Sequence, residues 1–581
     1  MGRKRWVLAC VLAVGCGGDD GGNNMSTAGS ETGSDGTTTD GSESSPSSDG
    51  TGSETGSDAG TDSESESDTS GEPGVDWSFA DIRGVANDDD DNSEGRRDWL
   101  EPPFDADNDL EPLTLPALPE GEQVRLTIAG DTNHIRLWRG GAGAPFLGAN
   151  SDAAGFEVTF TPDAGESLWV EFGEYNARGT LKLERLDAAS EVLDSAEIVL
   201  HGAPLILNHH LQPAEHIWVV DLTGGCGAAN GPFLAAYDAL GDRVTGVPGT
   251  SYDCDRWIQD EIEFATGHDG GGARQDVTID SIRDRGLDDV PEDLFFSADN
   301  AYNTWGKGPK TSFDSFGNLE ISPPVTVDGV EYPFGRVYFG RDAQEGIDAE
   351  FADFLISQEI QAPFEVDSTW LCVGHVDEWM SWVPDKTAPR GFRFLYSDVD
   401  MAYALLEGLD QNLPLPRFGA DHGYPTVGSI VDDNALRAYN EDIRDDYLLP
   451  MRARMKSELG LSEEEIIGVP SIFEELGGGC SGLGLALIPG MVNLIVANFG
   501  DGDSHLMVPD PFLRTSDNDQ GADPLIAAFT AAMPGEHQLH YIDNWYSYHL
   551  LSGEVHCGTN VRRTPLVTNW WEVGAHLLGG N

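Results

Sequence analysis

Basic residues are scarce in this chain of 581 residues, in which 33 lysines and arginines stand against 101 aspartates and glutamates. The formal net charge of −68 excludes a protein that binds nucleic acid by neutralising phosphates. It predicts instead that the chain attracts cationic partners or divalent cations. After its first sixteen residues the chain also lacks any apolar run near the roughly 18 residues that cross a bilayer, which excludes a polytopic membrane protein.

The N-terminal part lacks the residues that build a core. No aromatic residue lies between Trp6 and Trp77, and no lysine or arginine lies between Arg5 and Arg83. Residues 17–75 consist mainly of glycine, serine, threonine, aspartate and glutamate, which cannot bury enough apolar surface to offset the entropy of ordering. We expect a disordered, self-repelling tether there. Wholesale disorder is excluded because 39% of the whole chain is hydrophobic.

Residues 1–16 have the parts of a bacterial lipoprotein signal peptide. Residues 3–5 are basic, residues 6–14 are apolar, and Cys16 follows small residues. Glycine and aspartate come directly after Cys16, which favours its lipidation over an ordinary secretory signal. We therefore expect an exported protein, either a cell-envelope lipoprotein or an extracellular one, whose only membrane contact is an N-terminal lipid anchor.

Residues 76–200 contain short runs in which apolar and polar residues alternate, at 124–128, 156–160, 168–172 and 181–186. Period-two alternation at close spacing predicts several short strands and a small β-sandwich.

Two acidic loops precede these strands, at residues 88–95 and 105–109. Alternate oxygen ligands followed by glycine are typical of calcium loops, although neither loop fits the complete EF-hand pattern. A solvated acidic surface is the alternative. The candidate metal ligands are Asp88, Asp90, Asp105, Asp107 and Asp109.

Residues 201–581 mix strand-like and helical patterns. A helix is predicted over residues 435–459; it should end at Gly460, and Pro450 should kink it or divide it in two. The segment is long enough for one large α/β catalytic domain or for two smaller ones, and periodicity does not decide between them.

The seven cysteines include no CxxC pair, so neither a structural zinc site nor a thioredoxin-like motif is supported. Cys10 and Cys16 lie in the signal peptide, which leaves an odd number of five and so indicates a reactive thiol in an exported protein. Disulfides would form in an oxidising compartment, but the sequence leaves three pairings open. The four cysteines concerned are Cys226, Cys254, Cys372 and Cys480.

Three stretches gather ionisable side chains, at residues 255–263, 373–378 and 553–560, and each alone could be an ordinary polar loop. Together they resemble the protein-arginine deiminases, calcium-dependent enzymes that convert arginine in proteins to citrulline. The resemblance extends from about Tyr175 to the C-terminus. It is also carried by residues 280–287, 314–325 and 558–563.

The resemblance implies an α/β fold in two parts. An immunoglobulin-like β-sandwich over residues 76–200 would precede a five-bladed α/β propeller of the guanidine-modifying superfamily over residues 201–581, the catalytic domain. The family's first β-sandwich has no evident counterpart here, and the tether takes its place.

The residue types suit the chemistry of a guanidinium, which is planar and permanently cationic, so that two carboxylates can each take a bidentate pair. A thiolate can attack its carbon once the thiol pKa is lowered or the substrate cation lies beside it. One imidazole can protonate the leaving ammonia and then deprotonate the water that hydrolyses the covalent thiouronium. The family pattern gives these roles to Asp260, Asp377, Cys557 and His375.

His556 adjoins Cys557 and suggests a Cys–His dyad. We reject it as the base because consecutive side chains of an extended chain point to opposite faces, and because the family pattern places the base at His375. Without the resemblance, a non-catalytic role would be the more common one for these residue types. A lone cysteine is more often a small buried hydrophobic residue, and a histidine beside an aspartate more often forms a structural pair.

The resemblance also implies two calcium sites made of oxygen ligands, as calcium prefers. Because Asp260 lies between two of these ligands, bound metal would fix the direction of its carboxylate. Without a cation so many neighbouring carboxylates would repel one another, although they could also decorate a solvated loop. The first site has Gln259, Glu263, Glu320 and the carbonyls of Phe316 and Leu319; the second has Glu261, Asp280, Ser281 and Asp284.

Three further residues match substrate contacts of the family. Trp257 would pack along the aliphatic stem of the substrate arginine, and Arg283 and Arg285 would hold peptide carbonyls, which favours arginine within a chain over free arginine. Two positions depart from the pattern: Leu551 replaces a basic residue of the vertebrate relatives, and Cys372 replaces a hydroxyl residue.

The sequence therefore predicts a calcium-dependent hydrolase that converts arginine in proteins or peptides to citrulline and releases ammonia. Two alternatives remain: a deiminase or amidinotransferase acting on free arginine or small guanidines, and a calcium-binding cell-surface adhesion protein. The sequence does not predict the natural substrate or the oligomeric state.

Overall fold

The computed structural model describes residues 75–91, 95–100, 109–140, 144–270, 272, 274–341, 344–500, 502–565 and 569–579. The predicted signal peptide, the lipidation site at Cys16 and all but the last residue of the predicted tether lie outside the described residues, as do Asp105 and Asp107. No helix of the described ranges combines the length and the apolar character that crossing a bilayer requires.

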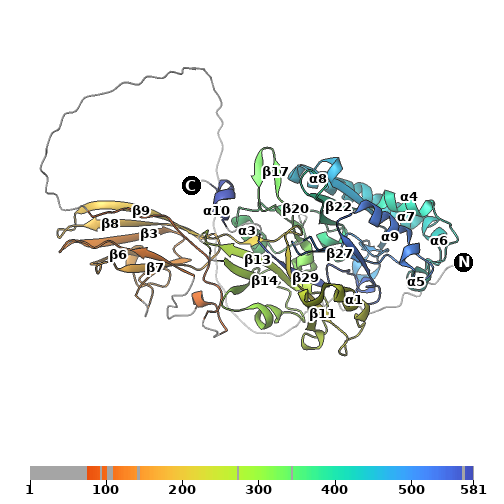
Figure 1. Cartoon of the computed structure of the whole chain (residues 1–581), viewed down its shortest axis with the longest axis horizontal. Helices are drawn as coiled ribbons and strands as arrows, with labels where there is room; N and C mark the ends of the chain where they lie inside the picture. Colours follow the sequence, from red (N-terminus) through yellow and green to blue (C-terminus); the bar gives the residue numbers. More distant parts are fainter. Residues whose placement is uncertain are drawn as a thin grey trace, which may run out of the picture. The chain divides into compact units, whose positions relative to one another are not determined.

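Two sheets with one hydrophobic core form the part of the chain over residues 82–202. Their pairs are antiparallel except that β1 runs parallel to β9, and Figure 1 shows β3, β8 and β9 side by side. The first sheet has the order β1 (Ile82–Gly84), β9 (Val192–Gly202), β8 (Arg178–Leu186), β3 (Gln123–Gly130), β6 (Glu157–Phe160); the second has β2 (Leu110–Thr114), β7 (Ser167–Phe172), β4 (Ile135–Arg139), β5 (Leu147–Gly148).

The four alternating runs seen in the sequence are confirmed as strands β3, β6, β7 and β8. Along β3 the side chains of Val124, Leu126 and Ile128 are buried while their neighbours are not, as the two-residue period of a half-buried strand requires. The sandwich-like arrangement therefore follows from the alternation.

Five further sheets repeat one pattern, in which a central strand pairs antiparallel with one neighbour and parallel with the other. In the order antiparallel, central, parallel, the strands are β29 (Thr559–Arg563), β11 (Ala214–Asp221), β12 (Val244–Pro248); β13 (Ile262–His268), β14 (Arg274–Asp280), β15 (Asn300–Thr304); β16 (Leu319–Ile321), β19 (Val337–Gly340), β20 (Phe364–Val366); β21 (Met380–Pro384), β22 (Phe392–Asp398), β23 (Ile466–Pro470); and β26 (Ile495–Asn498), β27 (Ser504–Pro509), β28 (Gln538–Ile542).

The remaining described strands are short. β10 (Ile206–Leu207) adds to the edge of β13, and two hairpins pair β17 (Val325–Val327) with β18 (Val330–Tyr332) and β24 (Phe473–Glu475) with β25 (Gly484–Ala486). The first of the five sheets joins distant parts of the chain, because β29 pairs with β11 with Val561 opposite Ile217.

The helix predicted over residues 435–459 is present and divided, as Pro450 indicated. α7 (Asn434–Ile443) is followed by a π-helical turn, Arg444–Leu448, and by α8 (Leu449–Leu459), which carries Pro450 in its first turn. Proline lacks an N–H, so the first turn is where it removes no hydrogen bond of the helix. Gly460 ends α8 in the left-handed conformation at φ 61°.

The other helices lie between the strands of the five sheets or close to the chain's C-terminus: α1 (Gly231–Tyr237), α2 (Ile258–Glu261), α3 (Ala349–Ser357), α4 (Val399–Glu407), α5 (Pro416–Asp421), α6 (Val427–Val431), α9 (Pro524–Ala532) and α10 (Trp570–Val573). The predicted mixed α/β character is therefore confirmed.

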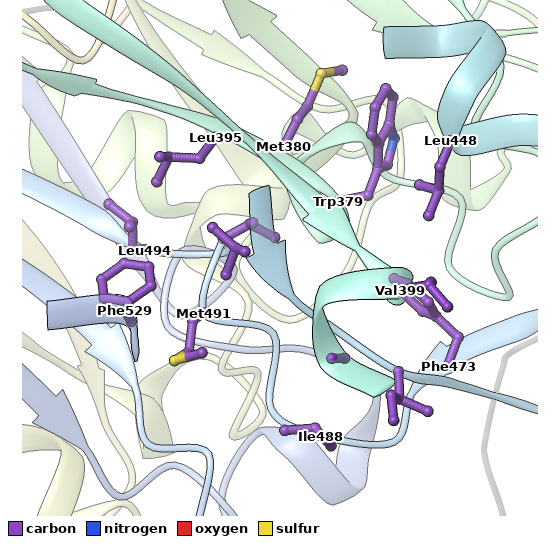
Figure 2. Close-up of a cluster of buried hydrophobic side chains, with 14 of the residues drawn as sticks. Trp379, Met380, Leu395, Val399, Leu448, Phe473, Ile488, Met491, Leu494 and Phe529 are labelled. Atoms are coloured by element: carbon purple, nitrogen blue, oxygen red, sulfur yellow. The ribbon is translucent and has the colours of Figure 1, made fainter. Parts of the chain in front are cut away.

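The largest hydrophobic cluster surrounds Trp379 and Met380, whose side chains are fully buried (Figure 2). Val399 of α4, Leu448 and Phe529 of α9 contribute to the same cluster. Because Trp379 directly follows the short turn η8 (Val376–Glu378), this core anchors a turn that carries candidate catalytic residues.

Two disulfides join Cys226 to Cys254 and Cys372 to Cys480. Among the cysteines of the described ranges, Cys557 is the one outside a disulfide, and it is buried. Of the three pairings that the sequence left open, the structure has this one, and the odd cysteine is the candidate nucleophile.

Candidate functional site

The five sheets bring their candidate site residues to equivalent positions. Each residue lies two or three positions before the strand that pairs antiparallel with the central strand: Asp260 before β13, Gly317 before β16, Asp377 before β21, Asn493 before β26 and Cys557 before β29. Residues that are remote in sequence therefore meet where the same end of five sheets converges. All four predicted catalytic residues are brought together in this way, with His375 two positions before Asp377.

His375 presents one nitrogen to the site. Its Nε2 lies 2.8 Å from the carbonyl oxygen of Ser312, which can only accept, so Nε2 carries the hydrogen and donates it. Nδ1 is buried, has no hydrogen-bond partner and lies 3.6 Å from Oδ1 of Asp260. In the neutral ring Nδ1 is thus the nitrogen with a free lone pair, and it is the atom placed to take up or give a proton.

Cys557 is 4% exposed, and its Sγ lies 3.5 Å from Oδ2 of Asp377. Burial, with the negative charges of Asp377 and Asp260, raises the pKa of this thiol well above its usual range. Without a positive charge nearby the thiol therefore keeps its proton, and a cationic substrate is what would favour the reactive thiolate.

Asn493 joins the two segments that carry the thiol and its carboxylate neighbour. Its Nδ2 donates to the backbone oxygen of Asp377 at 3.1 Å and lies 3.4 Å from Sγ of Cys557, while its Oδ1 accepts from the backbone N–H of His556 at 2.8 Å. The sequence analysis missed Asn493, because no cluster of ionisable residues surrounds it in the chain.

Each of the two candidate catalytic carboxylates has one oxygen that forms a hydrogen bond and one that does not. Oδ2 of Asp260 accepts from Nη1 of Arg285 at 3.2 Å, and Oδ2 of Asp377 pairs with Nδ1 of His556 at 2.9 Å. The Oδ1 atoms of both aspartates are buried and have no hydrogen-bond partner among the residues that the structure describes. Buried acceptors without partners are costly, and a planar cation rich in N–H donors would satisfy both.

The sequence analysis expected the side chains of His556 and Cys557 to point to opposite faces, and this expectation is wrong. Both side chains contact Oδ2 of Asp377, because the backbone turns there and the N–H of Thr559 donates to the carbonyl of His556 at 3.0 Å. Burial alone would lower the pKa of His556, but its hydrogen bond to Asp377 and the charge of Glu320 raise it. The assignment of the base to His375 stays a prediction.

Two of the predicted substrate-binding residues contact Asp260: the carbonyl of Trp257 accepts from its backbone N–H, and Arg285 donates to its Oδ2. Trp257 is half-buried at the N-terminus of α2, and its ring meets Tyr548 edge-on at 5.6 Å between centroids. Arg285 donates to both carboxylate oxygens of Asp255 at 3.1 Å, in addition to Asp260. Their contacts with substrate, and those of Arg283, stay predictions.

Arg283 itself donates through Nη1 to Oγ of Ser315 at 2.5 Å. Leu551, which departs from the family pattern, ends the short turn His549–Leu551 and is partly exposed. No guanidinium or ammonium group therefore comes from position 551.

The residues predicted for the first calcium site meet around one small cavity of about 20 Å³, enough for a single water-sized occupant. Gln259, Glu263, Leu319 and Glu320 line it, and the carbonyl of Phe316 accepts from Nε2 of Gln259 at 3.4 Å. Burial raises the pKa of Glu263 to about 8 and that of Glu320 to about 7. Two buried carboxyl groups beside carbonyl oxygens fit a hard divalent cation, which would offset their desolvation.

A second cluster unites Glu261, Asp280 and Asp288, whose ligand oxygens lie within 4.8 Å of one another. Both oxygens of Glu261 and Oδ1 of Asp280 are buried without a hydrogen-bond partner. Burial raises the pKa of Glu261 to about 8 and that of Asp280 to about 7. Orphaned carboxylate oxygens of this kind also fit calcium, and Asp288 is a member that the sequence analysis missed.

Two other residues predicted for the second site lie differently. The hydroxyl of Ser281 donates to the carbonyl of Asp314 at 3.0 Å. Asp284 is exposed and forms an ion pair with Lys310, so its side chain turns away from the cluster in this structure.

The acidic segment before the sandwich strands forms a further cluster, of Asp89, Asp91 and Asp98. Asp89 and Asp109 lie close enough to share a hydrogen bond, and burial together with the charge of Asp89 raises the pKa of Asp109 to about 10. Asp88 instead accepts from Nδ2 of Asn303 at 2.7 Å, and Asp90 from the N–H of Gly95 at 2.6 Å.

Comparison with known proteins gives the same family over most of the chain. A family model described as protein-arginine deiminase (PAD) matches residues 192–572. Protein-arginine deiminase type-4 of Rattus norvegicus is 32% identical over 428 residues, which are 70% of this chain and 62% of that protein. Type-1 of Homo sapiens is 33% identical over 395 residues, 64% of this chain and 56% of that protein. Type-3 of Homo sapiens is 30% identical over 438 residues, 71% and 61% respectively.

The chain thus spans about three fifths of the length of the curated relatives it matches. The matched region contains both disulfides, the four catalytic candidates and the two calcium-type clusters of the five-sheet part. On the extent of that match, the chain belongs to the protein-arginine deiminase family.

Proposed function

We propose that this protein hydrolyses arginine residues of proteins or peptides to citrulline and ammonia in a calcium-dependent reaction. The observation that carries the proposal is the convergence of three buried, unpartnered atoms, Oδ1 of Asp260, Oδ1 of Asp377 and Nδ1 of His375, beside the thiol of Cys557. Two acceptors, a proton carrier and a nucleophile are what deimination of a guanidinium requires.

The positive charge of the substrate guanidinium draws it to the two carboxylates. The guanidinium of arginine donates N–H groups to the free oxygens of Asp260 and Asp377, which holds its central carbon in place for the thiol of Cys557. For Asp260 to bind the guanidinium through both carboxylate oxygens, its Oδ2 must also be free. Arg285 therefore has to break its hydrogen bond to that oxygen, while it retains its two hydrogen bonds to Asp255.

The chemistry then runs through one thiol and one imidazole. With the cation beside it, Cys557 gives its proton to Nδ1 of His375 and attacks the guanidinium carbon, and the imidazolium returns that proton to the departing nitrogen as ammonia leaves. His375, neutral again, deprotonates a water that attacks the S-alkylthiouronium. The C–S bond breaks, His375 returns the proton that it took from water to the thiolate of Cys557, and the remaining proton of that water passes to the released ammonia. One guanidinium cation and one water have then become a neutral ureido group and ammonium.

Calcium fits both clusters near α2. Gln259, Glu263 and Glu320 with the carbonyls of Phe316 and Leu319 would hold one ion, and Glu261 and Asp280, aided by Asp288, would hold another. Bound there, calcium would supply positive charge that replaces protons on buried carboxyl groups. Since Gln259 and Glu261 flank Asp260, fixing both neighbours fixes the direction of its carboxylate.

The finer fold follows the same reasoning. The repeated strand pattern and the shared positions of the site residues support a five-bladed propeller with one sheet in each blade, over residues 201–581. The two sheets that share a core support an immunoglobulin-like domain over residues 76–200. Residues 17–75 would form the tether.

Two disulfides support an oxidising compartment and hence export, together with the basic and apolar start of the chain. A lipid on Cys16 would anchor the tether to the cell envelope. Mass spectrometry of the N-terminal peptide tests this, and an unmodified, uncleaved N-terminus in the producing cell would contradict it.

The decisive experiment incubates the protein with a blocked arginine peptide and with free arginine, in calcium and in chelator, and measures ureido groups and ammonia. We expect activity on the peptide, in calcium only, and its loss in Cys557→Ser. Activity on free arginine alone would support an enzyme for small guanidines instead. Calcium-dependent cell adhesion that survives Cys557→Ser, with no ammonia released by the intact chain, would support an adhesion protein.

A further inference from the structure

His210 and His556 both turn an imidazole nitrogen toward the carboxylate of Glu320. Nε2 of His210 lies 3.5 Å from Oε2, and Nε2 of His556 lies 3.5 Å from Oε1. All three side chains are more than nine-tenths buried. Both distances exceed the 2.7–3.2 Å of an N–H···O hydrogen bond, so three strong ligand groups face one another across a gap that they do not close themselves.

The size of that gap fits a metal ion. Zinc binds imidazole nitrogen and carboxylate oxygen at about 2.0–2.2 Å in tetrahedral geometry, which sets neighbouring ligand atoms about 3.4 Å apart. Each nitrogen-to-oxygen distance is close to that value, with Oε2 of Glu320 facing His210 and Oε1 facing His556, and one ligand atom from each of the three residues lies within 4.8 Å of the other two. Two histidines and one glutamate supply three of the four ligands of a tetrahedral zinc site.

Both imidazoles are also held at their other nitrogen. Nδ1 of His556 is 2.9 Å from Oδ2 of Asp377, and Nδ1 of His210 is 3.3 Å from Oγ of Ser381 on β21. Metal-binding histidines almost always have such a partner, because it fixes the ring so that Nε2 points at the metal. The orientation of both rings is therefore set before any metal binds.

The two imidazoles give this cavity nitrogen ligands, which calcium does not use. Calcium takes oxygen ligands, whereas imidazole nitrogen favours zinc and its neighbours in the transition series. Arg563 also lines the cavity, but its guanidinium donates to the backbone oxygens of His210, Gln212 and Val496. The two negative charges of Glu263 and Glu320 exceed the single positive charge of Arg563.

We propose that His210, Glu320 and His556 form a binding site for a transition-metal dication such as zinc, and that this ion competes with calcium because both require Glu320. The metal site stands on the three side chains alone. Its competition with calcium rests on the proposed function.

Direct binding tests the site. The untagged protein, freed of metal, is titrated with zinc by calorimetry and with cobalt(II) by visible absorption, which reports coordination without any turnover. We expect zinc to bind and the cobalt complex to show the intense bands of four-coordinate nitrogen and oxygen ligation. His210→Asn should weaken zinc binding at least tenfold, and Ser381→Ala, which removes only the partner of Nδ1, by about tenfold.

His540→Gln is the matched control, because Nε2 of His540 lies 2.8 Å from Nδ1 of His505 in a separate histidine pair on β27 and β28. Its zinc affinity should equal that of the wild type. Absence of zinc binding, equal affinity in His210→Asn, or a loss confined to His540→Gln would each overturn the site. Should His210→Asn fail to fold by circular dichroism, Ser381→Ala decides, and unchanged affinity in that variant counts against the proposal.

Competition is measured separately, as the calcium midpoint of citrulline formation with and without zinc. Zinc should raise the calcium midpoint of the wild type. The change that zinc causes in the calcium midpoint of His210→Asn should be at least tenfold smaller, when each protein is compared with its own zinc-free curve. Zinc binding in a protein without deiminase activity would refute the proposed function and leave the metal site standing. An active enzyme that binds no zinc would refute the metal site alone.

Discussion

A Cβ atom on Gly317 would lie 2.6 Å from Nδ1 of His375. The same atom would be 3.1 Å from Oδ2 of Asp377 and 3.3 Å from Oδ1 of Asp260. Gly317 does not have a positive φ, so its backbone conformation does not require glycine. The missing side chain instead leaves open the space in which the imidazole and both carboxylates converge.

Gly317→Ala should therefore reduce kcat/KM for an arginine peptide by about a hundredfold or more, because the new methyl group displaces His375 or fills the space of the substrate. The free energy of unfolding should change by less than about 1 kcal/mol, since only side chains have to shift. Initial rates and urea unfolding measure the two effects. Gly231→Ala on α1, where nothing lies within 4 Å of the added atom, is the control. Full activity in Gly317→Ala would contradict this account of the site.

Asn493 is expected to act as a positioning residue. Asn493→Ala removes the hydrogen bonds that tie Asp377 to the turn of Cys557, so kcat should fall about tenfold to a hundredfold while KM changes little. Loss of these buried bonds should also cost about 1–3 kcal/mol of unfolding free energy. Asn498→Ala, on the strand that follows, removes two hydrogen bonds outside the site, one to the carbonyl of Leu211 and one from the N–H of Gly500, and serves as the control. A rise in KM with unchanged kcat would show that Asn493 binds substrate instead.

The two disulfides should stabilise the fold unequally. Replacing a cysteine pair by serine restores freedom to the unfolded chain, and more so for the longer loop. Cys372 and Cys480 are 108 residues apart and Cys226 and Cys254 only 28, so loss of the first pair should cost about 1 kcal/mol more than loss of the second. Urea unfolding of the two double variants measures the difference. The reverse order would contradict the entropic explanation.

Histidine burial should make the protein sensitive to acid. Burial, and then the charge of Arg274, lowers the pKa of His268 to about 4, whereas an unfolded histidine titrates near 6.5. Above pH 6.5 the ring is neutral in both states. As pH falls from 6.5 to 4 the unfolded chain takes up a proton that the folded chain refuses, so folding loses about 2 kcal/mol from this residue.

Urea unfolding at pH 7.5 and pH 4.5 compares the wild type with His268→Asn. The wild type should lose about 2 kcal/mol more stability than the variant over this interval, because the carboxyl groups that titrate in the same range are common to both. Equal losses in the two proteins would show that His268 titrates normally.

The sequence predicted the local features well because each has a local cause. Alternation of side chains gave four strands of the sandwich, and Pro450 with Gly460 gave the division and the end of the helix after residue 434. The candidates Asp260, His375, Asp377 and Cys557 were recognised through the family resemblance that three short clusters of ionisable residues carry together, and the fold brings those clusters together.

Residues that act without neighbours in the chain could not be found this way. Asn493 reaches the site only because it precedes a strand equivalent to those of the other sheets, and Asp288 joins its carboxylate cluster from outside the recognised motif. Gly317 lies inside the recognised segment 314–325, but it has no side chain that would indicate a role. The geometric argument against His556 failed because it assumed extended backbone where the chain turns. Cysteine pairing likewise depends on distances in space that spacing in the sequence does not contain.

The pairing of β29 with β11 also means that the first of the five sheets is completed only at the end of translation. Asp260, His375 and Asp377 leave the ribosome well before Cys557, and the strand that holds Cys557 in place needs a partner made hundreds of residues earlier. Every nascent chain shorter than this point lacks the candidate nucleophile and the last strand of the first sheet. Under the proposed function an incomplete chain should therefore be inactive, because the thiol is added only after the rest of the site has been translated.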